Sequence, residues 1–122
     1  MTTILVLDDS PTMVMSLSRI LSKSGYTVET ASNGREGMDK LKGGMKPNLI
    51  LTDINMPVMD GIAFIKEVRK LAATRFTPIV VLTTESGGPK QAEARSAGAS
   101  GWLTKPTQPD ALIATMKQLL PA

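Results

Sequence analysis

The chain has 122 residues, which is the size of one domain and is long enough to bury a hydrophobic core. Its hydrophobic fraction of 42% is that of an ordinary globular protein, which excludes a disordered or fibrous chain. No apolar run approaches the roughly 20 residues that cross a bilayer, and the absence of cysteine excludes disulfides and thiolate metal sites. The N-terminus also lacks a signal-peptide pattern, so we expect a cytoplasmic protein that does not bind membranes.

The net charge is +3 and the isoelectric point is near 9.4, but the 14 basic residues are scattered along the chain. The densest group is Lys66, Arg69 and Lys70, whose spacing is typical of the solvent-facing side of a helix. Proteins that recognise nucleic acids usually cluster their basic residues, so we do not expect nucleic-acid binding. The chain contains no histidine and cannot use one as a base, a metal ligand or a phosphate carrier.

The first predicted strand covers residues 4–7, and a helical pattern follows it. Ser10 is suited to cap that helix, and Pro11 then stands at the first helical position. Gly25 ends the helix, because glycine commonly follows a helix C-terminus. The apolar residues of this segment recur at helical spacing: Met13, Leu17, Ile20 and Leu21.

Four further strand-helix pairs follow in the same alternation. The predicted strands cover residues 26–28, 49–51, 79–82 and 102–103. Helices are predicted over about 34–41, from a start at Asp60-Gly61 through Leu71 and Ala72, over about 90–97, and through a last apolar stripe of Leu112, Met116, Leu119 and Leu120. Short apolar strands that alternate with helices predict an α/β fold, in which a five-stranded parallel sheet is covered on both faces. The chain shows no repeat or linker, so we predict one domain over residues 1–122.

Polar residues stand where four of these strands end. The first strand ends on Asp8 and Asp9, the third on Asp53 and the fifth on Lys105, while the fourth runs into residues 83–85, a Thr-Thr-Glu sequence. In a doubly wound sheet, the functional crevice lies at the carboxyl ends of the strands. The sequence therefore predicts that three carboxylates, hydroxyl groups and an ammonium group meet at one edge.

Three neighbouring carboxylates repel one another and need a cation to remain ionised. Ligands that are all oxygen atoms indicate a hard ion, Mg²⁺ in preference to Ca²⁺, and two carboxylates with one backbone carbonyl would suffice to hold it. Mg²⁺, Lys105 and the Thr83 hydroxyl together would form a receptacle for a phosphoryl group. A carboxylate within that receptacle can act as a nucleophile, and Asp53 on the middle predicted strand is the best-placed candidate.

These residues lie in four motifs that resemble those of response-regulator receiver domains, most of all the stand-alone chemotaxis CheY type. The motifs are LVLDDS with Asp8 and Asp9, LTDINMPVMDG with Asp53, VVLTTES with Thr83, and GWLTKP with Lys105. The resemblance covers essentially the whole chain, and the four motifs occur in order, each at a strand end. It implies a flavodoxin-like (βα)5 sandwich.

The resemblance also implies a role for each matching residue. Asp53 would be the phosphoacceptor, with Mg²⁺ held by Asp9 directly, by Asp8 mostly through water, by Asp53 and by the backbone carbonyl of Asn55. The phosphoryl-binding and switch residues would be Thr83, Thr84, Lys105 and Trp102. The Lys105–Pro106 peptide bond would be cis.

Two further pairs of residues follow from the resemblance. Asn55 and Glu85 would tune hydrolysis of the phosphoaspartate, and because both are polar we expect a lifetime of seconds to minutes. Val14 flanks the apolar stripe of the first helix and Met15 lies opposite that stripe, and receivers meet their phosphodonor with this helix. We therefore expect them to contribute to partner contact, with Met15 facing water.

The function implied is that of a single-domain response regulator in a two-component or chemotaxis phosphorelay. A histidine kinase or a histidine-containing phosphotransfer protein would supply the phosphoryl group, and the output would be contact with another protein. We expect a monomer that catalyses only its own phosphorylation and dephosphorylation and is not otherwise an enzyme.

Several alternatives stay open at this stage. The chain could be a phosphate sink or a relay intermediate without an output target. It could also be a small aspartyl-phosphate phosphatase, although that class needs an acid where Asn55 stands. A flavodoxin-like domain that binds a nucleotide or flavin would need a glycine- or hydroxyl-rich loop for the phosphate group in place of Asp8 and Asp9. Each candidate site residue also has a purely structural interpretation. Asp8 and Asp9 could cap a helix, Asp53 could begin a turn, Thr83 could pack within a strand, and Trp102 could be an ordinary aromatic residue.

Overall fold

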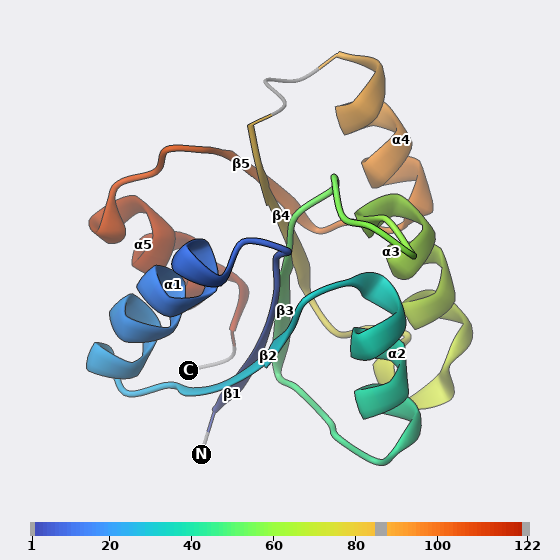
Figure 1. Cartoon of the computed structure of the whole chain (residues 1–122), viewed down its shortest axis with the longest axis horizontal. Helices are drawn as coiled ribbons and strands as arrows, with labels where there is room; N and C mark the ends of the chain where they lie inside the picture. The colour runs from blue at the N-terminus through green and yellow to red at the C-terminus, as the bar shows by residue number, and fades with distance from the viewer. Residues whose placement is uncertain (1, 85–87, 121–122) are drawn as a thin grey trace.

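The structure is a computed structural model that describes residues 2–84 and 88–120 (Figure 1). These residues form one parallel sheet with the strand order β2-β1-β3-β4-β5, which confirms the predicted doubly wound architecture. The strands are β1 (Thr3–Leu7), β2 (Thr27–Ala31), β3 (Leu49–Thr52), β4 (Ile79–Thr83) and β5 (Gly101–Thr104). The helices are α1 (Pro11–Lys23), α2 (Gly34–Lys42), α3 (Gly61–Lys70), the 3₁₀ helix η1 (Ala72–Thr74), α4 (Pro89–Ala97) and α5 (Pro109–Leu119).

The helices cover both faces of the sheet (Figure 1). Helices α1 and α5 lie on one face, and α2, α3 and α4 lie on the other. Alternate residues of β1 pack on opposite faces of the sheet, because successive side chains of a strand point in opposite directions. Ile4 and Val6 belong to the core beneath α1 and α5, whereas Leu5 and Leu7 belong to the core beneath α2, α3 and α4. The central strands are thereby buried on both faces, as parallel strands usually are.

Side chains cap the three helices that begin nearest the predicted site. Ser10 Oγ accepts a hydrogen bond from the Met13 amide at 3.3 Å, and Pro11 begins α1, both as predicted. Asp60 Oδ1 caps α3 by accepting from the Ala63 amide at 2.8 Å, which confirms the predicted helix start. Asn33 caps α2 in the same way. These caps fix the points at which the chain leaves the carboxyl edge of the sheet.

The bounds of two predicted elements differ most from the structure. Strand β2 begins at Thr27, not at Tyr26, and continues to Ala31, because parallel pairing with β1 extends it through polar residues that an apolar pattern does not include. Helix α3 ends at Lys70, although Leu71 and Ala72 continue its apolar spacing. Leu71 adopts extended backbone angles, and the chain then turns into η1.

Within the described ranges, 2–84 and 88–120, none of the helices is both long and apolar enough to cross a membrane.

Candidate functional site

Strands β1 and β3 deliver two aspartates to the same point of the carboxyl edge. The two strands are neighbours at the centre of the sheet, and Leu7 pairs with Thr52 at their ends. Asp8 and Asp53 are the next residues, and the Asp53 amide donates a hydrogen bond to the Leu7 carbonyl at 3.0 Å. The sheet register therefore brings together two carboxylates that lie far apart in the sequence.

Lys105 joins these two carboxylates from the loop after β5. Its ammonium lies 2.7 Å from Asp8 Oδ2 and 3.0 Å from Asp53 Oδ2. Burial lowers the pKa of the Lys105 ammonium, but hydrogen bonds and charge attraction to Asp8 and Asp53 outweigh this effect and raise the pKa above its ordinary value. Lys105 is therefore charged at neutral pH. The Lys105–Pro106 peptide bond is cis, as the resemblance implied.

Asp9 completes a cluster of three carboxylates. One oxygen atom from each of Asp8, Asp9 and Asp53 lies within 4.8 Å of the others. Asp8 is buried and Asp9 is exposed, so the cluster opens to solvent. Three carboxylates and the Lys105 ammonium leave two negative charges, which one divalent cation would balance. An oxygen-only cluster of this charge fits Mg²⁺. Asn55, whose carbonyl was predicted as a further ligand, lies exposed in the loop after β3.

The Asp53 carboxylate has a defined orientation. Its Oδ2 faces the Lys105 ammonium, while its Oδ1 accepts a hydrogen bond from the Ile54 amide at 2.7 Å. Sequence reasoning did not single out Ile54, because a backbone amide carries no residue-type signal. Gly61 lies directly beside this turn, and a Cβ atom at that position would stand 2.1 Å from the Asp53 carbonyl oxygen. Only glycine allows α3 to begin so close to Asp53.

A backbone hydrogen bond links Thr83 to Lys105. It is the last residue of β4, it is fully buried, and its carbonyl accepts from the Lys105 amide at 2.7 Å. Thr84 follows it and is exposed. Glu85, which was predicted to tune hydrolysis, lies outside the described residues. The predicted roles of Thr83 and Thr84 in phosphoryl binding stay predictions.

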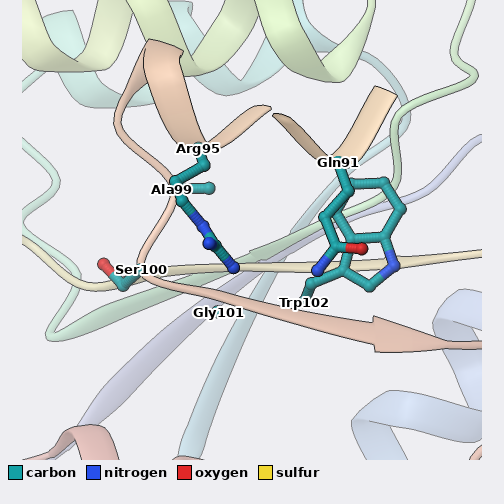
Figure 2. Close-up of a pocket in the computed structure, with 6 residues that line it drawn as sticks. All are labelled: Gln91, Arg95, Ala99, Ser100, Gly101 and Trp102. Carbon is teal, nitrogen blue, oxygen red and sulfur yellow. The ribbon is translucent and has the colours of Figure 1, made fainter. Parts of the chain in front are cut away.

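Trp102 lies on β5, half-buried against the core beneath α4. It lines a small cavity of about 30 Å³ together with Gln91 and Arg95 of α4. Figure 2 shows both α4 side chains reaching toward β5, while the ring nitrogen of Trp102 points away from Arg95. This buried nitrogen has no hydrogen-bond partner among the residues that the structure describes. An unsatisfied buried donor carries a cost in free energy. The switch role of Trp102 stays a prediction.

Val14 and Met15 lie on α1 at the rim of the carboxylate cluster. Val14 is half-buried, and Met15 is 63% exposed, as its helical position predicted. Both line a groove of about 310 Å³ that reaches Asp8 and Asp9 and continues to Glu36 on α2. The sequence did not reveal this groove, because its walls come from segments that only the fold brings together. A role of Val14 and Met15 in partner contact stays a prediction.

Comparison with known proteins identifies the family. The sequence pattern of the response regulator receiver domain matches residues 4–117. The chain belongs to the response regulator receiver domain family. This receiver domain is 34% identical to Protein PilH of Pseudomonas aeruginosa, with 98% of each chain covered. It is 36% identical to the chemotaxis protein CheY of Thermotoga maritima, with 95% of each covered.

Solved structures agree with this family. The chemotaxis protein CheY4 of Vibrio cholerae matches the receiver domain with a TM-score of 0.92 and 42% identity, covering 98% of this chain and 99% of that one. The flavodoxin-like five-stranded sandwich expected from the sequence is therefore confirmed. The structure also brings Asp8, Asp9, Asp53 and Lys105 of the receiver domain together at one edge of the sheet, as the strand ends predicted.

Proposed function

We propose that the chain is a single-domain response regulator that accepts a phosphoryl group on Asp53. The observation that carries this proposal is the Lys105 ammonium, which contacts both Asp8 and Asp53 at the edge where β1, β3 and β5 end. Phosphoryl transfer depends mainly on positioning and on stabilising charge, and this site offers an oriented carboxylate nucleophile beside a fixed cation.

In the proposed reaction, an oxygen of the Asp53 carboxylate attacks the phosphorus atom of a phosphohistidine on a histidine kinase or phosphotransfer protein. A phosphorus–oxygen bond forms as the phosphorus–nitrogen bond breaks, and the imidazole leaves with the electron pair. Lys105 neutralises charge on the transferred group, and Thr83 donates a hydrogen bond to it after local rearrangement. Mg²⁺, held by Asp8, Asp9, Asp53 and the Asn55 carbonyl, would neutralise phosphoryl oxygens when bound.

The output of the phosphorylated chain is binding to another protein in a two-component, chemotaxis-type pathway. Similarity to CheY proteins over nearly the full chain supports this assignment. The chain itself catalyses only its own phosphorylation and dephosphorylation. The Trp102 ring, whose nitrogen lacks a partner among the described residues, reorients in response and reports the active state.

Trp102 fluorescence tests this proposal, because Trp102 is the only tryptophan. The wild-type protein and Asp53→Asn are titrated with Mg²⁺, and acetyl phosphate or beryllofluoride is then added. We expect a Mg²⁺-dependent change in the wild type that Asp53→Asn loses, together with phosphorylation of the wild type by intact-mass measurement. Asparagine can still accept from the Ile54 amide, so the variant should remain folded.

Absence of both the fluorescence change and the added mass in the wild type would overturn the proposed function. Added mass on Asp53 with unchanged fluorescence would keep the phosphoacceptor and remove Trp102 from the response.

A further inference from the structure

Thr52 buries a hydroxyl group at the end of β3. The strand reads Leu-Ile-Leu-Thr, and Thr52 is 0% exposed. Valine has nearly the same shape and would fill this space without bringing a polar group into the core. A buried hydroxyl at such a position needs a hydrogen-bond partner, and the identity of the partner indicates what the hydroxyl does.

The partner is the peptide group that carries the Ile54 amide. Thr52 Oγ1 donates a hydrogen bond to the Asp53 carbonyl oxygen at 2.9 Å. That carbonyl and the Ile54 N–H belong to one planar peptide unit. The Ile54 N–H donates in turn to Asp53 Oδ1 at 2.7 Å. A continuous chain of hydrogen bonds therefore runs from the Thr52 hydroxyl through the peptide to the Asp53 carboxylate, and each bond polarises the next.

Hydrogen bonds also fix the two peptide units that flank this one. The Gly61 amide donates to the Ile54 carbonyl at 2.8 Å, and the Asp53 amide donates to the Leu7 carbonyl at 3.0 Å. The Asp53 carbonyl oxygen faces the Gly61 backbone, where no Cβ atom would fit. Within this frame, the Thr52 hydroxyl satisfies the carbonyl and sets the plane of the peptide.

We propose that Thr52 is a positioning residue for phosphoryl transfer at Asp53. Its hydroxyl fixes the peptide whose N–H holds Asp53 Oδ1, so that Oδ2 stays directed at Lys105. The inference rests on the proposed function and deepens it, because it assigns a role to a residue that would not touch the phosphoryl group. Positional errors of about 1 Å can slow a reaction by roughly 100-fold, so loss of this orientation should be visible in the rate.

The test compares Thr52→Val and Thr52→Ser with the wild type. Phosphorylation by acetyl phosphate is followed at saturating Mg²⁺, and the Ile54 amide is followed by NMR and hydrogen exchange in the metal-free protein. We expect Thr52→Val to slow phosphorylation by about tenfold or more and to increase exchange at Ile54. Thr52→Ser, which keeps the hydroxyl, should restore both. Thr52→Ala serves as the second hydroxyl-free variant if valine prevents folding.

Thr74→Val is the matched control. Thr74 is also buried, and its hydroxyl donates to the Val68 carbonyl at 2.7 Å, away from the carboxylate cluster. The Thr74→Val variant should be less stable than the wild type, with no change in the phosphorylation rate of the folded protein.

A wild-type rate in Thr52→Val, or equal slowing by Thr52→Val and Thr52→Ser, would overturn the positioning role. Failure of the proposed function differs from this, because the wild type itself would then not be phosphorylated.

Discussion

Val58 has an unfavourable backbone conformation in the loop between β3 and α3. Its φ is 69°, the only positive value among the described non-glycine residues, and it is 79% exposed. The Met59 amide donates to the Pro57 carbonyl at 2.7 Å, which makes Val58 the centre of a γ-turn of the strained type. A β-branched residue is poorly suited to this region, so the turn stores strain a few residues from Asp53.

Replacement of Val58 should relieve part of that strain. We expect Val58→Asn to stabilise the protein by about 1 kcal/mol, because asparagine tolerates positive φ and an exposed valine contributes little packing. The free energy of unfolding in urea measures the effect. Val58→Ala is the control, since it removes the branch and keeps a Cβ atom at positive φ. If Val58→Asn is no more stable than Val58→Ala, the strain lies elsewhere.

At the scale of secondary structure, Arg69 links three segments that follow one another along the chain. Its Nη1 lies 3.0 Å from the Thr74 carbonyl, 3.1 Å from that of Arg75 and 2.6 Å from that of Thr77. Its Nε and Nη2 lie 3.1 Å and 2.7 Å from the Gly98 carbonyl at the end of α4. One guanidinium group therefore satisfies carbonyls at η1, at the entry to β4 and at the C-terminus of α4.

Arg69→Lys should be destabilising, although it keeps the charge. A single ammonium cannot reach carbonyls on both sides of the planar guanidinium, so part-buried carbonyls such as those of Thr77 and Gly98 would lose this donor. We expect a loss of roughly 2–4 kcal/mol in the free energy of unfolding. Arg19→Lys, on the exposed surface of α1, should stay within about 0.5 kcal/mol of the wild type. Equal effects of the two substitutions would show that the Arg69 contacts contribute little.

At the scale of the whole molecule, helices α3 and α4 differ greatly in how much of their surface is buried against the sheet. Helix α3 buries five residues, which include Phe64, Ile65 and Val68. Helix α4 is of similar length but buries only Ala94 among its residues, and within ranges 2–84 and 88–120 no side chain caps its N-terminus. Displacement of α4 would therefore expose little buried apolar surface, whereas displacement of α3 would expose the centre of the hydrophobic core.

Native-state hydrogen exchange should report this difference. We expect the amides of α4 to exchange through openings that cost at least about 1.4 kcal/mol less than those of α3, a factor of ten in protection. The amides of β1 and β3 should be among the slowest, because both strands are central. Equal protection of α3 and α4 would contradict this difference and would indicate that the two helices open together.

The sequence by itself determined the fold class and most of the candidate site. Short apolar runs that alternate with helical patterns were sufficient to predict five parallel strands, because central strands that are buried on both faces are mostly apolar. The carboxyl ends of parallel strands share one edge, so the strand pattern alone places Asp8, Asp53 and Lys105 together. Cap residues such as Ser10 and Asp60 act within a few residues and were equally predictable.

The tertiary structure alone decided the features that depend on contacts distant in the chain or on backbone atoms. Helix α3 ends before its apolar pattern does. There Arg69 donates to the Thr74 carbonyl of the following turn, and the Thr74 hydroxyl donates back to the Val68 carbonyl of α3. No local propensity encodes these contacts. The hydrogen-bond chain from Thr52 to Asp53 passes through a backbone peptide, which has no residue-type signature. The groove at Met15 exists because α1 follows β1, α2 follows β2, and these two strands are neighbours in the sheet. Residue types reveal which groups are present, but the fold decides which of them meet.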